Sequence, residues 1–103
     1  MTSLPNLHDS IFIDVKMDWE TAIVQMRFQL PQETGEPDLP FVVIEAVEVT
    51  DLKCPRQLPW GPSIFVNSAS LKMLPIGKLL TIEIQSGDVL EVVCGGISVS
   101  DPR

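Results

Sequence analysis

The chain has 103 residues, of which 14 are acidic and 7 are basic, so its formal net charge at pH 7 is −7. This length fits one domain, residues 1–103, and 45% hydrophobic residues indicate a folded rather than a disordered chain. The negative charge disfavours nucleic acids and anionic membrane surfaces as partners. No apolar run approaches the ~20 residues that span a bilayer. The first residues lack the features of an export signal, so we expect a cytoplasmic protein.

Residues 1–9 show no periodicity and predict an N-terminal arm. Apolar and polar residues then alternate over 10–17 and over 21–29, with the period of two that is typical of half-buried strands. A short polar break, Asp18-Trp19-Glu20, separates the two runs. We therefore predict an antiparallel hairpin at this point of the chain.

Three prolines, a glycine and three acidic residues predict a loop over 31–40. The strand expected at 41–49 has an imperfect alternation, because Phe41 and Val43 share parity with Glu45. This pattern indicates either a β-bulge near Glu45 or burial on both faces of the strand.

Prolines punctuate residues 50–62, so this segment cannot form a central strand. A short strand is expected at 63–67, followed over 68–77 by a segment that fits either one helical turn or a loop. Two alternating runs at 79–86 and 88–94 predict a final hairpin around Ser86-Gly87-Asp88, and 97–99 is a candidate last strand.

About six short strands separated by turns predict an all-β fold, either a small antiparallel sandwich or a partly open barrel. The strands are expected near 10–17, 21–29, 41–49, 63–67, 79–86 and 88–94. The inward-facing positions of the two hairpins predict a core that contains Ile13, Val15, Val24, Met26, Ile82, Ile84, Leu90 and Val92.

The chain offers few residues that could hold a metal or perform catalysis. Cys54 and Cys94 lie forty positions apart and there is a single histidine, so we expect free thiols, no metal and no cofactor. His8-Asp9 is the one pair that resembles a catalytic base with its carboxylate. We expect it instead to hydrogen-bond the backbone where the arm meets the first strand, and we predict no enzymatic activity.

Acidic residues and a tryptophan gather in the first half of the chain. Residues 1–52 contain ten acidic and two basic residues, a net charge of −8, whereas residues 53–103 carry +1. Trp19 and Trp60 both fall in predicted turns, where a tryptophan more often plugs the core than anchors a partner. An exposed Trp19 would instead be a candidate hot spot for a basic protein. The predicted binding residues are Asp14, Asp18, Trp19, Glu20, Glu33, Glu36 and Asp38.

Three segments carry a resemblance to a known group: Leu7-His8-Asp9-Ser10, Pro59-Trp60-Gly61-Pro62-Ser63 and Ile82-Glu83-Ile84-Gln85-Ser86-Gly87-Asp88. Together they resemble small, largely β bacterial proteins that are similar to the immunity-type proteins of polymorphic toxin systems. The resemblance extends from residue 7 to about residue 94. It implies binding to a toxin domain and supplies no catalytic residues.

We therefore expect a non-enzymatic protein-binding domain, most concretely an immunity protein that neutralises a basic, nuclease-like toxin. One alternative is a structural β domain that forms homo-oligomers through exposed edge strands. Another is a small ligand-binding barrel.

Overall fold

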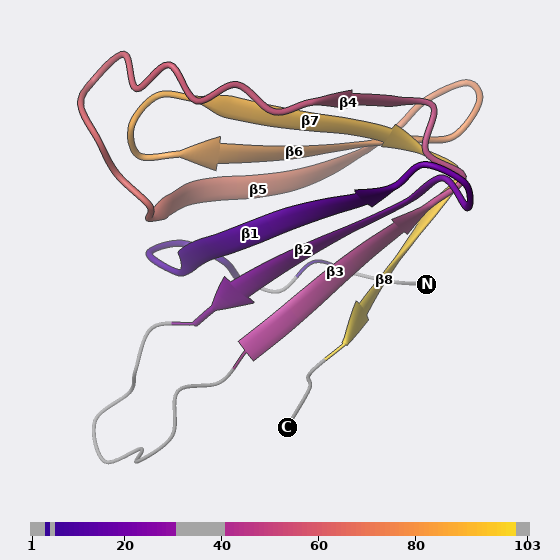
Figure 1. Cartoon of the computed structure of the whole chain (residues 1–103), viewed down its shortest axis with the longest axis horizontal. Coiled ribbons are helices and arrows are strands. Elements are labelled where there is room, and N and C mark those ends of the chain that lie inside the picture. The colour runs from indigo at the N-terminus through magenta and orange to yellow at the C-terminus, as the bar shows by residue number, and fades with distance from the viewer. Residues whose placement is uncertain (1–3, 5, 31–40, 101–103) are drawn as a thin grey trace.

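The computed structural model describes residues 4, 6–30 and 41–100, which form eight β-strands and no helix. The strands make two four-stranded antiparallel sheets that pack face to face (Figure 1). The first sheet has the order β1-β2-β3-β8 and the second the order β4-β7-β6-β5. The predicted all-β fold, expected as a small antiparallel sandwich or a partly open barrel, is thereby confirmed. The strands are β1 (Ile11–Asp18), β2 (Ile23–Gln29), β3 (Phe41–Val47), β4 (Asp51–Lys53), β5 (Val66–Met73), β6 (Lys78–Ile84), β7 (Val89–Cys94) and β8 (Gly96–Ser100).

Two strands are additional to the six predicted, namely β4 and β8, and β8 forms at the candidate last strand 97–99. β5 continues to Met73, so the predicted strand at 63–67 and the predicted helical turn or loop from residue 68 are both wrong in their bounds. Ala69 and Leu71 provide only a weak inward-facing row, and pairing with β6 holds the segment extended. β4 is a three-residue edge strand against β7, which agrees with the exclusion of a central strand there.

The core lies between the inner faces of the two sheets. Six of the eight predicted core residues are buried, namely Val24, Met26, Ile82, Ile84, Leu90 and Val92, whereas Val15 is only half-buried. The prediction for Ile13 is wrong, because its side chain is 38% exposed. The register of β1 shifts between Phe12 and Asp14, so Phe12 takes the inner position and stacks on Phe28 with 5.3 Å between the ring centroids.

β3 pairs with β2 without any register shift, so of the two alternatives expected for this strand, the β-bulge near Glu45 is wrong. Val42, Ile44 and Ala46 face the core, and the residues between them face outward. Phe41 is the most exposed of the outward side chains, at 41%. Glu45 accepts a hydrogen bond from Gln25 Nε2 at 2.8 Å on this outer face.

The chain crosses between the sheets twice at the same end of the sandwich. The β3–β4 and β7–β8 connections both lie there, next to the β1–β2 turn (Figure 1). Backbone hydrogen bonds join the crossings, from Gly95 N to Val47 O and from Thr50 N to Val93 O, both at 2.9 Å. β4 thus lies beside β7 and gives the second sheet its Greek-key order.

At the opposite end, the start of β1 reaches the second sheet. Phe12 N donates to Ile64 O and Asp9 N donates to Val66 O, both at 2.8 Å. Ile11 and Phe65 form an isolated bridge, and the sheets do not close into a barrel. The described residues include no helix that is long and apolar enough to cross a membrane.

Candidate protein-binding site

The β1–β2 turn, residues 19–22, is held by hydrogen bonds on both sides. Asp18 Oδ1 accepts the backbone N–H of Glu20 at 3.1 Å and of Thr21 at 3.2 Å. On the other side, Ala22 O accepts from Val49 N at 2.9 Å, which ties the turn to the β3–β4 connection. Aspartate favours this position because its short side chain can bond to the backbone two and three residues ahead. The turn is therefore fixed rather than free to move with its tryptophan.

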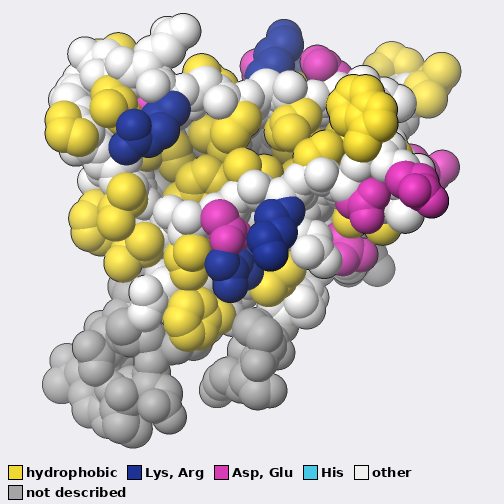
Figure 2. Space-filling model, in the orientation of Figure 1, with side chains coloured by type: hydrophobic (Ala, Val, Ile, Leu, Met, Phe, Trp, Pro, Cys, Tyr) yellow, Lys and Arg dark blue, Asp and Glu magenta, His cyan; other side chains and the backbone are white. Residues whose placement is uncertain are grey.

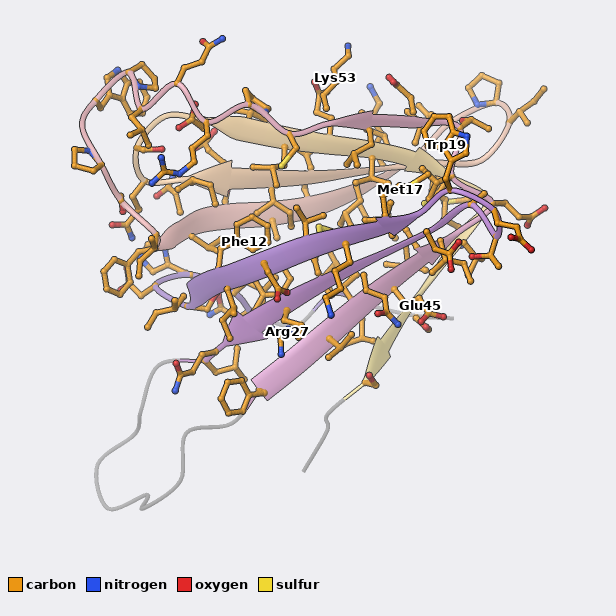
Figure 3. All side chains as sticks on the ribbon, viewed as in Figure 1. Phe12, Met17, Trp19, Arg27, Glu45 and Lys53 are labelled. Atoms are coloured by element: carbon orange, nitrogen blue, oxygen red, sulfur yellow. The ribbon has the colours of Figure 1, made fainter. Side chains whose placement is uncertain are left out.

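Trp19 projects from this fixed turn and is 88% exposed, so the expectation that it plugs the core is wrong. Figure 3 places its ring at the end of the sandwich, beyond the end of β1. Trp60 is also exposed, at 77%, but its ring lies against the β6–β7 turn. A Cβ atom added at Gly87 would lie 2.9 Å from two of the Trp60 ring carbons. Trp19 is therefore the more exposed of the two tryptophans.

Three acidic residues lie at the same end of the sandwich as Trp19, one of which, Glu48, places its side chain against Gly95 of the β7–β8 connection. Asp18 and Glu20 are exposed on either side of it in sequence. Glu48 is exposed in the β3–β4 connection, directly before Val49, whose N–H bonds to the turn. Figure 2 shows Asp and Glu side chains gathered at this end of the molecule. The sequence prediction missed Glu48, since only the crossing between the sheets brings it to residues 19–22.

Asp14 belongs to a different surface. It faces outward in the middle of β1, opposite Arg27 on β2. Arg27 Nε donates to Asp14 Oδ1 at 2.8 Å, and Arg27 Nη2 bonds to Asp14 Oδ2. This hydrogen bonding by Arg27 lowers the pKa of Asp14 and outweighs the opposing effect of desolvation. Because its charge is matched within the first sheet, we leave Asp14 out of the binding surface.

Glu33, Glu36 and Asp38 lie outside the described residues. The surface that the structure supports therefore consists of Asp18, Trp19, Glu20 and Glu48, which we call the Trp19 surface. A shallow hollow of about 530 Å³ lies beside the Trp19 surface. One of the residues that line it, Lys16, is basic. The hollow is lined by Lys16, Met17, Asp18, Trp19, Thr21, Ile23, Gln25 and Glu45.

His8 and Asp9 join the N-terminal arm to the second sheet. The Nδ1 atom of His8 lies 2.8 Å from Asn67 O, and Gln85 Nε2 donates to Asp9 Oδ1 at 2.7 Å. The contact of His8 with a backbone carbonyl agrees with the contact expected where the arm meets the first strand, whereas Asp9 bonds to a side chain. Asp9 itself has a positive φ of 64°, a conformation that aspartate tolerates better than most residues.

Ser86-Gly87-Asp88 forms the predicted turn and also holds a distant loop. Gly87 has φ 96°, and Asp88 is only 6% exposed. The Asp88 carboxylate accepts bonds from Ser86 Oγ at 2.7 Å, Gln57 N at 2.8 Å and Leu58 N at 2.9 Å. Burial by itself would raise the pKa of Asp88, but these hydrogen bonds outweigh burial and the pKa is lowered. Asp88 is therefore a structural anchor for residues 57–58.

Both cysteines are free thiols, with Cys54 exposed and Cys94 buried. Burial of Cys94, predicted from its strand register, is confirmed, and burial raises the pKa of its thiol. Within residues 4, 6–30 and 41–100, no three His, Cys, Asp or Glu side chains come together as a metal site.

The fold and this surface define an antiparallel β-sandwich with an acidic, tryptophan-bearing end. Comparisons with protein-family models, with curated proteins and with solved structures found no match.

Proposed function

We propose that this protein is a non-enzymatic, cytoplasmic binding domain that docks a basic protein partner on the Trp19 surface. The resemblance of its sequence segments to immunity-type proteins leads us to propose a nuclease-like toxin domain as that partner, in a bacterial cell. The toxin would supply the basic surface, since nucleases bind a polyanionic substrate.

The observation that carries the proposal is the 88% exposure of Trp19 on a turn held by three hydrogen bonds, two to the Asp18 carboxylate and one between the backbones of Ala22 and Val49. An exposed tryptophan contributes nothing to the core, and the turn obtains its own bonds from Asp18 and Val49. Because hydrogen bonds hold the backbone of the turn, only the side-chain torsions of Trp19 become restricted when its ring enters a pocket on a partner. Tryptophan is also among the residues that most often dominate binding energy at interfaces.

The acidic side chains around Trp19 support a basic partner in particular. Asp18, Glu20 and Glu48 are exposed, and none of the three has a salt bridge among the described residues. Charges at the rim of an interface mainly accelerate association and do so less at high salt. The pairing of Asp14 with Arg27 leaves that carboxylate less available for the same purpose.

The test is coexpression with a tagged toxin domain encoded by the adjacent gene, followed by surface plasmon resonance at about 50 and about 300 mM salt. Trp19→Ala is expected to weaken binding by ~2 kcal/mol or more. Asp18→Lys combined with Glu20→Lys is expected mainly to slow association. Trp60→Ala is the matched control, because it removes the other exposed tryptophan. If the affinity and the association rate are unchanged by salt, by Trp19→Ala and by the charge reversals, this interface is refuted.

A further inference from the structure

Each sheet of the sandwich has two edge strands, and three of these four edges carry features that oppose pairing with another chain. β1 is interrupted by the register shift at Ile13 and carries charged side chains. β5 has a register shift between Val66 and Ser68 and a lysine at position 72. β4 is only three residues long. Bulges, charges and short length are the usual means by which natural edge strands avoid adding a further strand.

β8 has none of these features over Gly96–Ser100. It pairs with β3 in one continuous register, and its five residues include no charge and no proline. It is the outermost strand of the first sheet, so one row of its backbone N–H and C=O groups faces away from β3 (Figure 1). Such an edge is a template for one more antiparallel strand.

We propose that the occupant of this edge is β8 of a second copy of the chain, related by a two-fold axis at Ser98. The two four-stranded sheets would then continue as one sheet of eight strands. In full overlap, Ser98 faces Ser98 of the second copy, Ile97 faces Val99, and Gly96 faces Ser100. Ser98 thus meets its own copy, and the apolar contact between Ile97 and Val99 occurs twice, as the symmetry of an isologous interface dictates.

This pairing would bury additional apolar surface mainly on the inner face of β8. Ile97 is buried at 9% exposure, but Val99 is only half-buried at the margin of the core. Ile97 of the second copy would lie beside Val99 and cover it. Pairs of β-branched side chains directly across two strands are favourable. On the outer face, the small side chains at positions 96, 98 and 100 offer no steric obstacle.

The carboxylate closest to β8 on its neighbouring strand does not oppose this contact. The nearest carboxylate on the neighbouring strand is that of Glu45, which lies opposite Ser98 on β3. Three strand spacings would separate the two copies of Glu45, or ~14 Å. That distance exceeds the Debye length of ~8 Å at physiological salt. A five-residue strand pair is nevertheless a small interface, so the dimer is expected to be weak and dependent on concentration.

The experiment is sedimentation velocity of the full chain from about 5 to about 500 µM. Ser98→Lys and Ser98→Glu each place like charges directly opposite one another at the axis. Each variant alone is expected to weaken self-association about fivefold or more. An equimolar mixture of the two variants pairs lysine with glutamate and is expected to restore dimers. Circular dichroism is the control that checks whether both variants remain folded.

Ser70→Lys on β5 is the matched control, since it adds the same charge to an exposed serine of the other sheet. It is expected to leave the dimer unchanged, as is Trp19→Ala, so this inference stands or fails separately from the proposed function. A wild-type chain that stays monomeric throughout would overturn it. So would variants at Ser98 that associate as the wild type does, or a mixture that stays monomeric.

Discussion

Two turns of this molecule use an aspartate and a neighbouring tryptophan in opposite ways. In the β1–β2 turn, Asp18 bonds to the next residues of its own turn, and Trp19 remains 88% exposed. In the β6–β7 turn, Asp88 is buried and bonds to a loop thirty residues earlier in the chain, whose Trp60 lies over Gly87. The same side-chain chemistry thus leaves a tryptophan in solvent where its bonds are local and joins distant parts of the fold where they are long-range.

The largest expected effect comes from removing the distant bonds. Asp88→Ala leaves the N–H groups of Gln57 and Leu58 without their acceptor in a part-buried place, so we expect the melting temperature to fall by about 10 °C. Thermal unfolding followed by circular dichroism measures this. A loss no larger than that of Asp18→Ala would remove the contrast between the two turns.

The same anchor predicts a pH dependence. The folded pKa of Asp88 is lowered, so the stability that its ionised form provides is complete above the ordinary pKa of ~3.9. That stability is lost as the pH falls through the folded pKa. The difference in melting temperature between the wild type and Asp88→Asn should therefore be full at pH 7 and narrow below about pH 4. A difference that is unchanged at low pH would contradict an ionised anchor.

Gly87→Ala tests the contact between the β6–β7 turn and Trp60. The added methyl group would overlap Pro59 and the Trp60 ring at 2.9 Å, and φ of 96° is strained for alanine. We expect a loss of about 5–10 °C in melting temperature. Gly61→Ala is the control, because Gly61 has a similar φ of 100° but no atom within 4 Å of an added Cβ. Equal losses for both variants would show that strain alone acts and that the contact contributes nothing.

Replacing each tryptophan by alanine should change the melting temperature by different amounts. Trp60→Ala removes the ring that covers Gly87, so we expect the melting temperature to fall by about 5 °C. Trp19→Ala removes a ring that is almost wholly in solvent, and we expect a change of no more than about 2 °C. Thermal melts of the two variants at one pH provide the comparison. A larger loss for Trp19→Ala would mean that its ring packs within the fold.

For Asp18→Ala we expect only a small decrease in melting temperature. The variant loses two local bonds to exposed N–H groups, which water can replace, and the bond between Ala22 and Val49 remains. We expect a decrease of about 2–4 °C, measured in the same melts. A decrease as large as that of Asp88→Ala would show that the β1–β2 turn also stabilises the whole sandwich.

Strong alternation made the central strands predictable from sequence. β2, β6 and β7 each place an unbroken apolar row on one face, and these rows became the buried core. Weak alternation was less informative at β5, where serines and a lysine separate the inward residues. The bulge at Ile13 was also hidden, because either Phe12 or Ile13 can fill the inner position by polarity alone.

The sequence by itself determined the class of the fold, the hairpin turns and the acidic bias of the first half, since period, turn residues and charge are local properties of the chain. Tertiary structure alone decided which charges act together. The crossing between sheets brings Glu48 to the β1–β2 turn, and strand register pairs Asp14 with Arg27. It also decided that Asp88 holds residues 57–58 and that Trp19 stays in solvent. These contacts depend on sheet order and register, which no local pattern encodes.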